Sequence, residues 1–263
     1  MEIINKYIDG GKAFDWGKAS SDYAKFRDIY PEKFYKFLAD KGLCINGQTV
    51  LDIGTGTGVL PRNMYRYGAK WVGTDISENQ IEQAMRLSQE AGMDIEYYTL
   101  PAEKTGTLGR HFDVITACQC YWYLDHKTTA PLFADLLEDG GRLAFLEMNW
   151  LPFEDEIAMA SEQIILKYNP EWNGCRHVFQ EINLPKNYFE YFETEDCGAY
   201  RLPVHFTRES WNGRMKACRG IGASSLTEKE KADWEAEHLK MLMGYPEEFD
   251  IAHFAAYVIL KKK

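Results

Sequence analysis

Val50-Leu51-Asp52-Ile53-Gly54-Thr55-Gly56-Thr57-Gly58 is the stretch that decides the fold. Its apolar and β-branched residues around one acid predict a short buried strand, and three glycines at alternate positions end that strand. Glycines carry no β-carbon, so the backbone can approach a ligand closely, and a helix expected at about 59–67 points its first N–H groups at the same place. The stretch therefore predicts a nucleotide-type binding loop at the edge of a parallel sheet.

The glycine spacing separates this loop from the common phosphate-binding loops. A dinucleotide loop follows G-x-G-x-x-G, and the third glycine position here holds Val59. A triphosphate loop, G-x-x-x-x-G-K-[ST], is absent as well. The loop contains no Lys or Arg, and Asp52 precedes it. These features favour a ligand with a positive charge over one that presents phosphates.

A second acid follows at the distance expected for a ribose contact. Trp71-Val72-Gly73-Thr74-Asp75-Ile76-Ser77 predicts a second strand that ends at Asp75, about 20 residues after the glycines. A carboxylate only accepts hydrogen bonds, so it suits a ribose diol without a 2′-phosphate. Ser77 is the expected N-cap of a helix at about 78–91.

In these features the chain resembles the class I S-adenosylmethionine-dependent methyltransferases, over most of residues 14–148. The motifs that carry the resemblance are Val50–Gly58, Val72–Ser77, Pro101-Ala102-Glu103, Phe112–Asp125 and Leu136–Met148. The resemblance implies an α/β fold with a Rossmann-like, doubly wound, seven-stranded and mostly parallel sheet, helices on both faces and a helical cap. It also implies S-adenosyl-L-methionine as cofactor, a sulfonium cation that agrees with the lack of a basic phosphate cradle.

The resemblance further implies a set of cofactor-binding residues, each at a matching motif position. The set comprises Tyr23, Arg27, Asp52, Gly54, Thr55, Gly56, Gly58, Asp75, Ile76, Ala102, Glu103 and Gln119. Tyr23 and Arg27 would sit by the methionine carboxylate, although an exposed helix Arg beside Asp28 is an alternative for Arg27. Asp52 would lie near the amino end of the cofactor or would bond the N–H groups of the loop itself.

Two positions depart from the pattern of the family. Related enzymes commonly have an acid before the adenine-loop alanine, but here Pro101 precedes Ala102. The Ala102 N–H can still bond the adenine ring, while Glu103 either contacts the exocyclic amine or faces solvent. Gln119 is expected beside the transferred methyl group. Trp122 stands where a His often occurs, and the aromatics around it either shield the sulfonium by cation–π contact or belong to the core.

Bulk properties exclude several classes of partner. The chain has 263 residues, 45% hydrophobic content and a net charge of −10, which disfavours nucleic acid and anionic membrane surfaces. The first nine residues do not resemble a signal peptide, and no 18-residue apolar run predicts a membrane span. Six cysteines without a C-x-x-C pair predict reduced thiols in the cytoplasm, and no spacing resembles a metal site. The oligomeric state is not predicted.

The order of elements predicts one methyltransferase domain over residues 1–263. A helical cap is expected at 1–46, the cofactor-binding core at 47–148, and insertions that form a substrate lid at 149–198 and 207–250. Strands are expected at about 49–53, 71–75, 94–98, 112–117, 142–147, 199–206 and 251–260. Helices are expected at about 59–67, 78–91, 128–138, 154–168, 207–219 and 227–243, the last with a Thr227–Glu230 capping box.

The predicted reaction is in-line displacement of the sulfonium methyl group by a nucleophile of a small-molecule substrate that the sequence does not identify. Because the leaving group is already activated, the protein is expected to contribute mainly alignment and desolvation. A general base is needed only for an acidic or protonated nucleophile, and no catalytic residue is assigned. Pocket candidates after residue 148 are Arg176, His177, Arg208, Trp211 and Arg214, and His126, His177 and His205 are possible acid–base groups. Two alternatives remain: a catalytically silent cofactor-sensing protein and a nicotinamide-dependent oxidoreductase.

Overall fold

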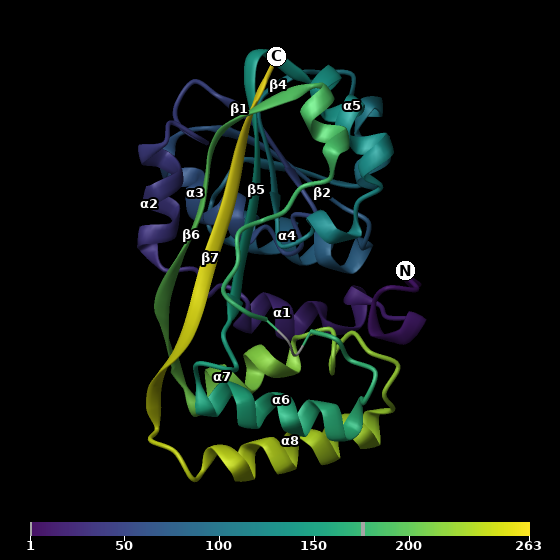
Figure 1. Cartoon of the computed structure of the whole chain (residues 1–263), viewed down its shortest axis with the longest axis vertical. Helices are drawn as coiled ribbons and strands as arrows, with labels where there is room; N and C mark the ends of the chain where they lie inside the picture. Colours follow the sequence, from purple (N-terminus) through teal and green to yellow (C-terminus); the bar gives the residue numbers. More distant parts are fainter. Residues whose placement is uncertain (1, 175–176) are drawn as a thin grey trace. The chain divides into compact units, whose positions relative to one another are not determined.

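A computed structural model describes residues 2–174 and 177–263 of the chain, and Figure 1 shows its elements. The strands are β1 (Thr49–Ile53), β2 (Lys70–Asp75), β3 (Ile95–Thr99), β4 (Phe112–Cys118), β5 (Leu137–Trp150), β6 (Phe192–Thr207) and β7 (Glu248–Lys262). The helices are α1 (Ser20–Phe26), α2 (Glu32–Asp40), α3 (Val59–Met64), α4 (Glu78–Glu90), α5 (His126–Leu136), α6 (Glu156–Tyr168), α7 (Arg208–Lys216) and α8 (Glu228–Leu242). The described residues also contain the short 3₁₀ helices η1 (Asp9–Gly11), η2 (Trp16–Ala19), η3 (Tyr65–Tyr67), η4 (Ala102–Leu108), η5 (Tyr121–Tyr123) and η6 (Lys186–Glu190).

The seven strands form one sheet in the order β3-β2-β1-β4-β5-β7-β6. β1 pairs in parallel with β2 and β4, β2 with β3, and β4 with β5. The predicted seven-stranded α/β fold is therefore confirmed. The order reverses beside β1, between the β1–β2–β3 half and the β4–β5 half, and ligands of open α/β sheets bind at the carboxyl ends of strands at such a switch point.

The chain divides into two compact units. Unit 1 comprises residues 1–29, 149–179 and 201–254, and unit 2 comprises residues 30–148, 180–200 and 255–263. The division within β5, between Met148 and Asn149, falls at the predicted end of the cofactor-binding core. The single domain and the substrate lid remain predictions.

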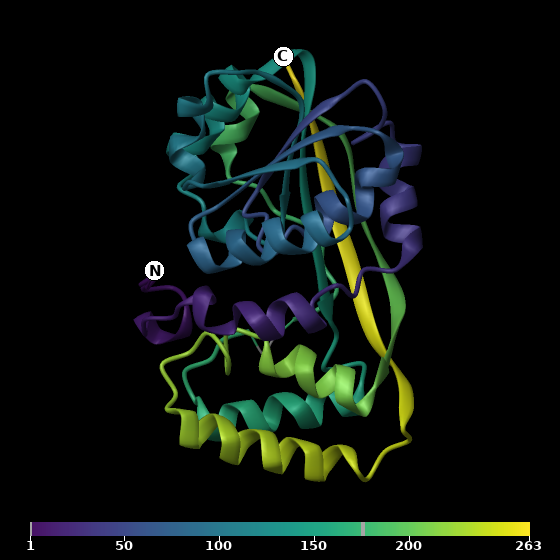
Figure 2. The same cartoon turned by 180° about the vertical axis from the view of Figure 1, so that it is seen from behind.

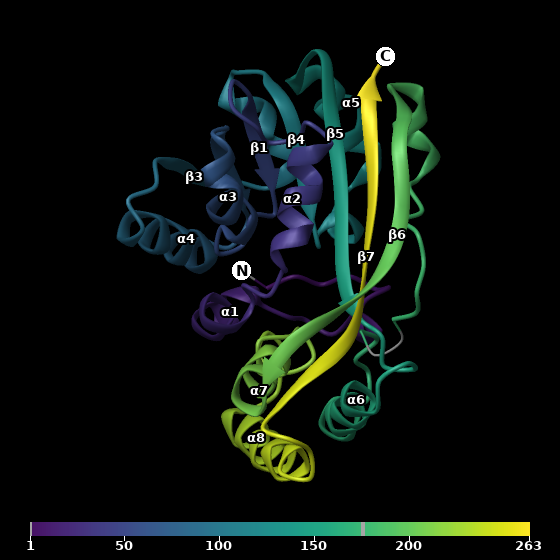
Figure 3. The ribbon, with the colours of Figure 1, turned by 90° about the vertical axis from the view of Figure 1, so that its left-hand side faces the viewer.

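Unit 2 contains the parallel part of the sheet with helices on both of its faces. In Figures 1 and 2, α2 and α3 lie on one side of these strands and α5 on the other, and Figure 3 shows β1, β4 and β5 side by side in that order. The core strands are apolar on both faces, as β1 shows, where Val50, Leu51 and Ile53 are all buried. α2 begins directly after Pro31, whose fixed φ suits the start of a helix.

The fifth strand begins earlier than predicted. Asp139-Gly140-Gly141, a sequence typical of a turn, lies inside β5, where Gly140 has a φ of 75°. The register with β4 shifts there, because Phe112 pairs with Leu137 and Val114 pairs with Arg142. The glycines thus form an irregularity within a strand instead of a separate connection before it.

Unit 1 gathers α1, α6, α7 and α8 around a core of large aromatic side chains. α6 and α8 lie side by side in Figures 1 and 2, and the Glu237 carboxylate on α8 accepts hydrogen bonds from Lys167 Nζ and Tyr168 Oη on α6. Against α1, a Cβ at Gly213 on α7 would lie 2.4 Å from the Phe26 ring, so these two helices require glycine at their crossing.

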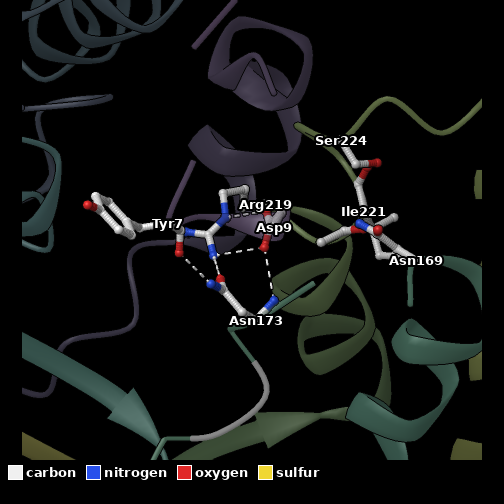
Figure 4. A network of polar contacts seen from close by, with 8 residues as sticks. Tyr7, Asp9, Asn169, Asn173, Arg219, Ile221 and Ser224 are labelled. Atoms are coloured by element: carbon white, nitrogen blue, oxygen red, sulfur yellow. Dashed lines mark hydrogen bonds and ion pairs between the residues drawn. The ribbon is translucent and has the colours of Figure 1, made fainter. Parts of the chain in front are cut away.

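A polar network fixes the N-terminal segment within unit 1 (Figure 4). Asp9 is buried, and its carboxylate accepts hydrogen bonds from Arg219 Nε at 2.6 Å and from the Asn173 N–H at 2.9 Å. Asn173 also donates to the Tyr7 carbonyl at 2.9 Å. Segments more than 160 residues apart in the chain are therefore joined by one buried carboxylate.

No helix in the described part of the chain is long and apolar enough to cross a membrane.

Candidate cofactor-binding site

The loop after β1 folds back on the end of β2. The Thr55 N–H donates to the Thr74 carbonyl at 2.9 Å, and the Gly56 N–H donates to Asp75 Oδ2 at 3.0 Å. Gly54, Gly56 and Gly58 have φ angles of 62°, 55° and 73°, in the left-handed region that glycine adopts without strain. The three glycines therefore satisfy a backbone requirement of the loop, and α3 begins directly after Gly58.

Two of these glycines also lie against protein side chains. A Cβ at Gly54 would come 2.8 Å from Cys120 Cβ, and a Cβ at Gly58 would come 2.4 Å from Tyr97 Oη. Cys120 donates its Sγ hydrogen to the Ile53 carbonyl at 3.1 Å, and Tyr97 is hydrogen-bonded to Ser88. Sequence reasoning missed Cys120 and Tyr97, because their contacts with the loop join residues distant in the chain.

Asp52 is buried in the sheet below the loop. The Thr116 hydroxyl on β4 donates to Asp52 Oδ1 at 2.7 Å. Burial raises the pKa of Asp52 to about 7, against the opposing effect of the Thr116 hydrogen bond. The structure thus gives Asp52 a hydrogen-bond partner on the neighbouring strand, a partner that sequence reasoning did not foresee.

Asp75 connects the glycine loop to the start of α4. Its carboxylate accepts the N–H groups of Gly56 and Ser77, and the N–H of Ile76 bonds to it as well. Burial raises the pKa of Asp75, and these three backbone donors act in the opposite direction. Ser77 occupies the predicted N-cap position of α4, but its side chain makes no capping hydrogen bond. The Asp75 carboxylate is therefore held in place while it retains lone pairs for further donors.

The predicted adenine loop lies beside Asp75. The Leu100 N–H donates to the Asp75 carbonyl at 2.8 Å, and Pro101 is the N-cap of η4 (Ala102–Leu108). Ala102 is buried at the start of η4. Glu103 accepts the Asp125 N–H at 3.1 Å, so its carboxylate contacts the N-terminus of α5 in this structure.

Gln119 follows β4 in a conformation that few residues other than glycine adopt. Its φ is 63°, its N–H donates to the Leu146 carbonyl at 2.9 Å, and its side-chain amide donates to the Met148 carbonyl. The next residue is Cys120, which contacts the glycine loop. Gln119 therefore lies at the carboxyl end of β4, against residues 146–148 of β5, and its role beside the methyl group remains a prediction.

The remaining aromatic and basic candidates lie in different places. Tyr121, Trp122 and Tyr123 form η5 in unit 2 and are only partly buried, so they are not core residues in this structure. Tyr23 lies on α1 of unit 1, and the Arg27 guanidinium is 4.8 Å from the centroid of its ring. The roles of Tyr23 and Arg27 toward the cofactor remain predictions.

Three pocket candidates of unit 1 belong to one cluster of side chains, and Arg176 lies outside the described residues. We call this group the Trp150 cluster; it consists of Trp150, His177, Phe206, Trp211, Arg214 and His253. Its ring centroids are 4.9 to 6.4 Å apart, and the Arg214 guanidinium lies 4.7 Å from the Trp150 centroid.

Other candidates serve the packing of their own elements. Arg208 donates to the Tyr245 carbonyl at 3.0 Å and is not in the Trp150 cluster. His126 is hydrogen-bonded to Tyr188, and burial lowers its pKa. His205 is exposed beside Asp250. In the part of the chain that the structure describes, no group of His, Cys, Asp and Glu side chains could hold a metal ion.

The donor chemistry of the loop fits a cofactor with a cation and a ribose diol. Two carboxylates, Asp52 and Asp75, border the loop, and residues 53–58 carry no basic side chain. Arg62 is the nearby base, and its Nε donates to the Thr57 carbonyl at 3.2 Å on the loop backbone. The residues present therefore suit S-adenosylmethionine better than a pyrophosphate.

Comparisons with known proteins agree with this chemistry. A family model described as a methyltransferase domain matches residues 50–141, which contain the glycine loop, Asp75 and the adenine loop. The chain belongs to the class I S-adenosylmethionine-dependent methyltransferases.

Curated relatives in this methyltransferase family include two bacterial enzymes. The ubiquinone biosynthesis O-methyltransferase of Pseudoalteromonas translucida (strain TAC 125) is 28% identical over 158 residues, which are 59% of this chain and 66% of that enzyme. The enzyme of the same name from Pseudomonas entomophila (strain L48) is 28% identical over 175 residues, 66% of this chain and 73% of that enzyme.

Solved structures share the α/β fold of this chain. The YcgJ protein of Bacillus subtilis superposes with a TM-score of 0.54 at 20% identity, over 89% of this chain and 99% of that chain. YjhP of Escherichia coli gives a TM-score of 0.53 at 20% identity, over 94% and 99%. With the family assigned, the methyltransferase is an enzyme whose cofactor is S-adenosylmethionine, and the nicotinamide and silent-binding alternatives are set aside.

Proposed function

We propose that this methyltransferase transfers a methyl group to a hydroxyl oxygen of a small-molecule acceptor. The observation that carries the proposal is the glycine loop after β1. The carboxylates of Asp52 and Asp75 border it, and residues 53–58 carry no basic side chain. The choice of oxygen rests on relatives named ubiquinone biosynthesis O-methyltransferase, which are 25 to 30% identical.

The cofactor residues are proposed to act by binding and orientation. Asp75 accepts hydrogen bonds from the ribose hydroxyls. The loop residues Gly54, Thr55, Gly56 and Gly58 line the cofactor, and Ile76, Ala102 and Glu103 surround the adenine. Asp52 attracts the cationic end, while Tyr23 and Arg27 bind the methionine carboxylate and Gln119 lies beside the methyl group. When bound, S-adenosylmethionine would supply an electrophilic methyl group. The acceptor oxygen would bond to that methyl carbon as the carbon–sulfur bond breaks, the neutral thioether would leave, and the hydroxyl proton would pass to solvent.

A small acceptor agrees with the charge of the chain. The net charge of −10 weakens binding to nucleic acid, which is itself anionic. No disulfide joins the described cysteines, in keeping with the proposed location in the cytoplasm. The oligomeric state is not part of the proposal.

The first experiment separates the acceptor atoms. The protein is incubated with methyl-labelled S-adenosylmethionine and matched aromatic acceptors that carry a hydroxyl, an amine or a thiol, and products are identified by mass spectrometry. The proposal expects label in methyl ethers. The proposal is contradicted if the label appears only in methylated amines or thiols, or if no hydroxyl acceptor is labelled.

A paired variant experiment tests the cofactor residues. Asp75→Asn replaces one acceptor oxygen of the carboxylate by a donor, so we expect binding of S-adenosylmethionine to weaken by about 10- to 100-fold, as loss of a charged hydrogen bond implies. Asp113→Asn is the control, because that carboxylate accepts the Thr49 N–H at the start of β1, away from the loop. If both variants bind S-adenosylmethionine with equal affinity in calorimetric titration, Asp75 does not contact the cofactor.

A further inference from the structure

His253 is a buried histidine of unit 1 that the proposed chemistry leaves without a role. It lies on β7 within the Trp150 cluster and is fully buried. Its ring is nearly parallel to the Phe206 ring, at 5.9 Å and 23°, and lies 6.4 Å from Trp211. Aromatic rings thus surround the imidazole, which leaves its two nitrogens as the polar atoms to be accounted for.

The hydrogen bonding of His253 defines its tautomer. Nδ1 lies 2.9 Å from the Ile251 carbonyl, which can only accept, so Nδ1 carries the hydrogen and donates. Burial lowers the pKa of His253 to about 3, and the positive charges of Arg214 and Arg27 act in the same direction. The ring is therefore neutral, and Nε2 presents a bare lone pair.

That lone pair is buried and has no hydrogen-bond partner among the described residues. A buried acceptor without a donor destabilises the folded state, and such groups in native proteins usually mark a ligand or an ordered water molecule. His253 Nε2 is thus an unpaired hydrogen-bond acceptor among aromatic rings. A ligand group that donates one hydrogen bond would satisfy this nitrogen.

The surroundings restrict what that donor can be. Arg214 lies within the cluster, and the positive charges of Arg214 and Arg27 both act on His253, so a cationic ligand is repelled. The rings of Phe206 and Trp211 favour an aromatic body. A neutral aromatic molecule with a hydroxyl group satisfies both conditions.

We propose that His253 Nε2 accepts a hydrogen bond from a hydroxyl group of an aromatic acceptor substrate, and that His253 selects phenols over ethers and over aromatic amine cations. The choice of a substrate as the donor rests on the proposed function. His253 is thus a specificity-determining residue that lies outside the set predicted from the sequence.

The test observes the His253 Nε2 nitrogen itself, in the 263-residue chain without cofactor. The protein is labelled with ¹⁵N-histidine and titrated with phenol, with anisole as the matched ether and with benzylammonium as the matched cation. The Nε2 resonance of His253 is assigned by its loss in His253→Asn. We expect phenol to shift this resonance toward the hydrogen-bonded position, and anisole and benzylammonium to leave it unchanged.

Two outcomes of the titration overturn the inference. The first is an Nε2 resonance that does not respond to phenol, which would assign the lone pair to a tightly held buried water molecule. The second is an equal response to phenol and anisole. Because no cofactor or turnover is involved, these results are independent of whether a methyl ether is formed.

Variants then test selectivity in the complete enzyme. Asn at position 253 can keep the bond to the Ile251 carbonyl and lacks an atom at the Nε2 position, whereas Gln can place an oxygen there. With a phenolic acceptor, His253→Asn should raise KM about tenfold, the factor of one ordinary hydrogen bond, and change kcat less. His253→Gln should restore most of the loss.

The exposed His205 is the control, and His205→Asn should behave as wild type. A purely structural role for His253 predicts equal losses in both position-253 variants and an unchanged ratio of phenol to amine binding, and that result rejects the inference. Absence of turnover in wild type with every acceptor rejects the proposed function instead.

Discussion

Gly54 lies against Cys120, and this contact explains its residue type as well as the φ angle does. An alanine at position 54 would adopt a left-handed conformation and bring its Cβ 2.8 Å from Cys120 Cβ. Gly109 provides a control, since its φ is 66° but no atom lies within 4 Å of its Cβ position. The two sites share the backbone strain and differ in the steric contact.

We expect Gly109→Ala to lower the free energy of unfolding by about 1 to 2 kcal/mol, the cost of a left-handed non-glycine residue. Gly54→Ala should cost more, because the Cys120 contact adds to that strain, and it should also weaken S-adenosylmethionine binding. Urea unfolding and calorimetric titration measure the two effects. A partial recovery in the double variant Gly54→Ala, Cys120→Gly would attribute the excess to this contact; equal costs at positions 54 and 109 would refute it.

The buried Asp52 carboxyl makes stability depend on pH. Its pKa rises from 3.8 in the unfolded chain to about 7 in the folded protein. Between these values the folded state binds more protons, so the contribution of Asp52 to stability is complete below about pH 4 and is lost as the pH rises toward 7. Since each pKa unit corresponds to about 1.4 kcal/mol, the loss amounts to about 4 kcal/mol.

Asp52→Asn removes this dependence. We expect the difference in unfolding free energy between wild type and Asp52→Asn to change by several kcal/mol between pH 4 and pH 7.5 and to stay constant above it. Chemical denaturation at a series of pH values measures the difference. Parallel pH curves for the two proteins would show that the carboxyl is not protonated in the folded state.

At the scale of elements, two predicted N-caps differ in what their side chains do. Thr227 forms the predicted capping box with Glu230 at the start of α8, whereas Ser77 makes no capping bond at the start of α4. Thr227→Ala should therefore destabilise the protein by about 1 kcal/mol, and Ser77→Ala should cost less. Urea unfolding of both variants checks this order, and the reverse order would show that the capping box contributes little.

Most elements could be predicted because their signals are local. Hydrophobic alternation and capping residues place β1, β2 and α8 within one or two residues of the structure. β5 shows the limit, since its glycines predict a turn while pairing with β4 begins before them. The start of β5 depends on its pairing with β4, a distant segment, so the residues of β5 alone do not predict it.

For the whole molecule, the Asp9–Arg219 pair links the N-terminal segment to the loop after α7. The Asp9 and Arg219 side chains are only 5% and 12% exposed. Breaking a buried pair leaves one charge uncompensated, so Asp9→Asn should lower the unfolding free energy by about 3 kcal/mol and accelerate hydrogen exchange in residues 3–14. Lys18→Ala, which breaks the exposed pair with Glu2, should change neither. Unchanged exchange in Asp9→Asn would refute this function of the pair.

The residues of the candidate site likewise fall into those with a local sequence signal and those without one. The glycine loop, Asp75 and Gln119 could be predicted because a strand, a turn and a helix follow one another in the chain. Cys120, Tyr97 and His253 could not, because their significance arises from contacts with residues far away in sequence. The histidine tautomer that exposes a lone pair is set by one carbonyl and is visible only in three dimensions.

The chain passes between the two units at residues 29/30, 148/149, 179/180, 200/201 and 254/255. Neither unit is therefore a contiguous stretch of the chain, and cutting the chain at one position cannot separate the two units intact. During synthesis, unit 2 lacks its final strand segment until residues 255–263 have been made. Both units are completed only when β7 is in place, so we expect nascent chains that end before residue 248 to lack the sheet's interior β7 and to depend on chaperones.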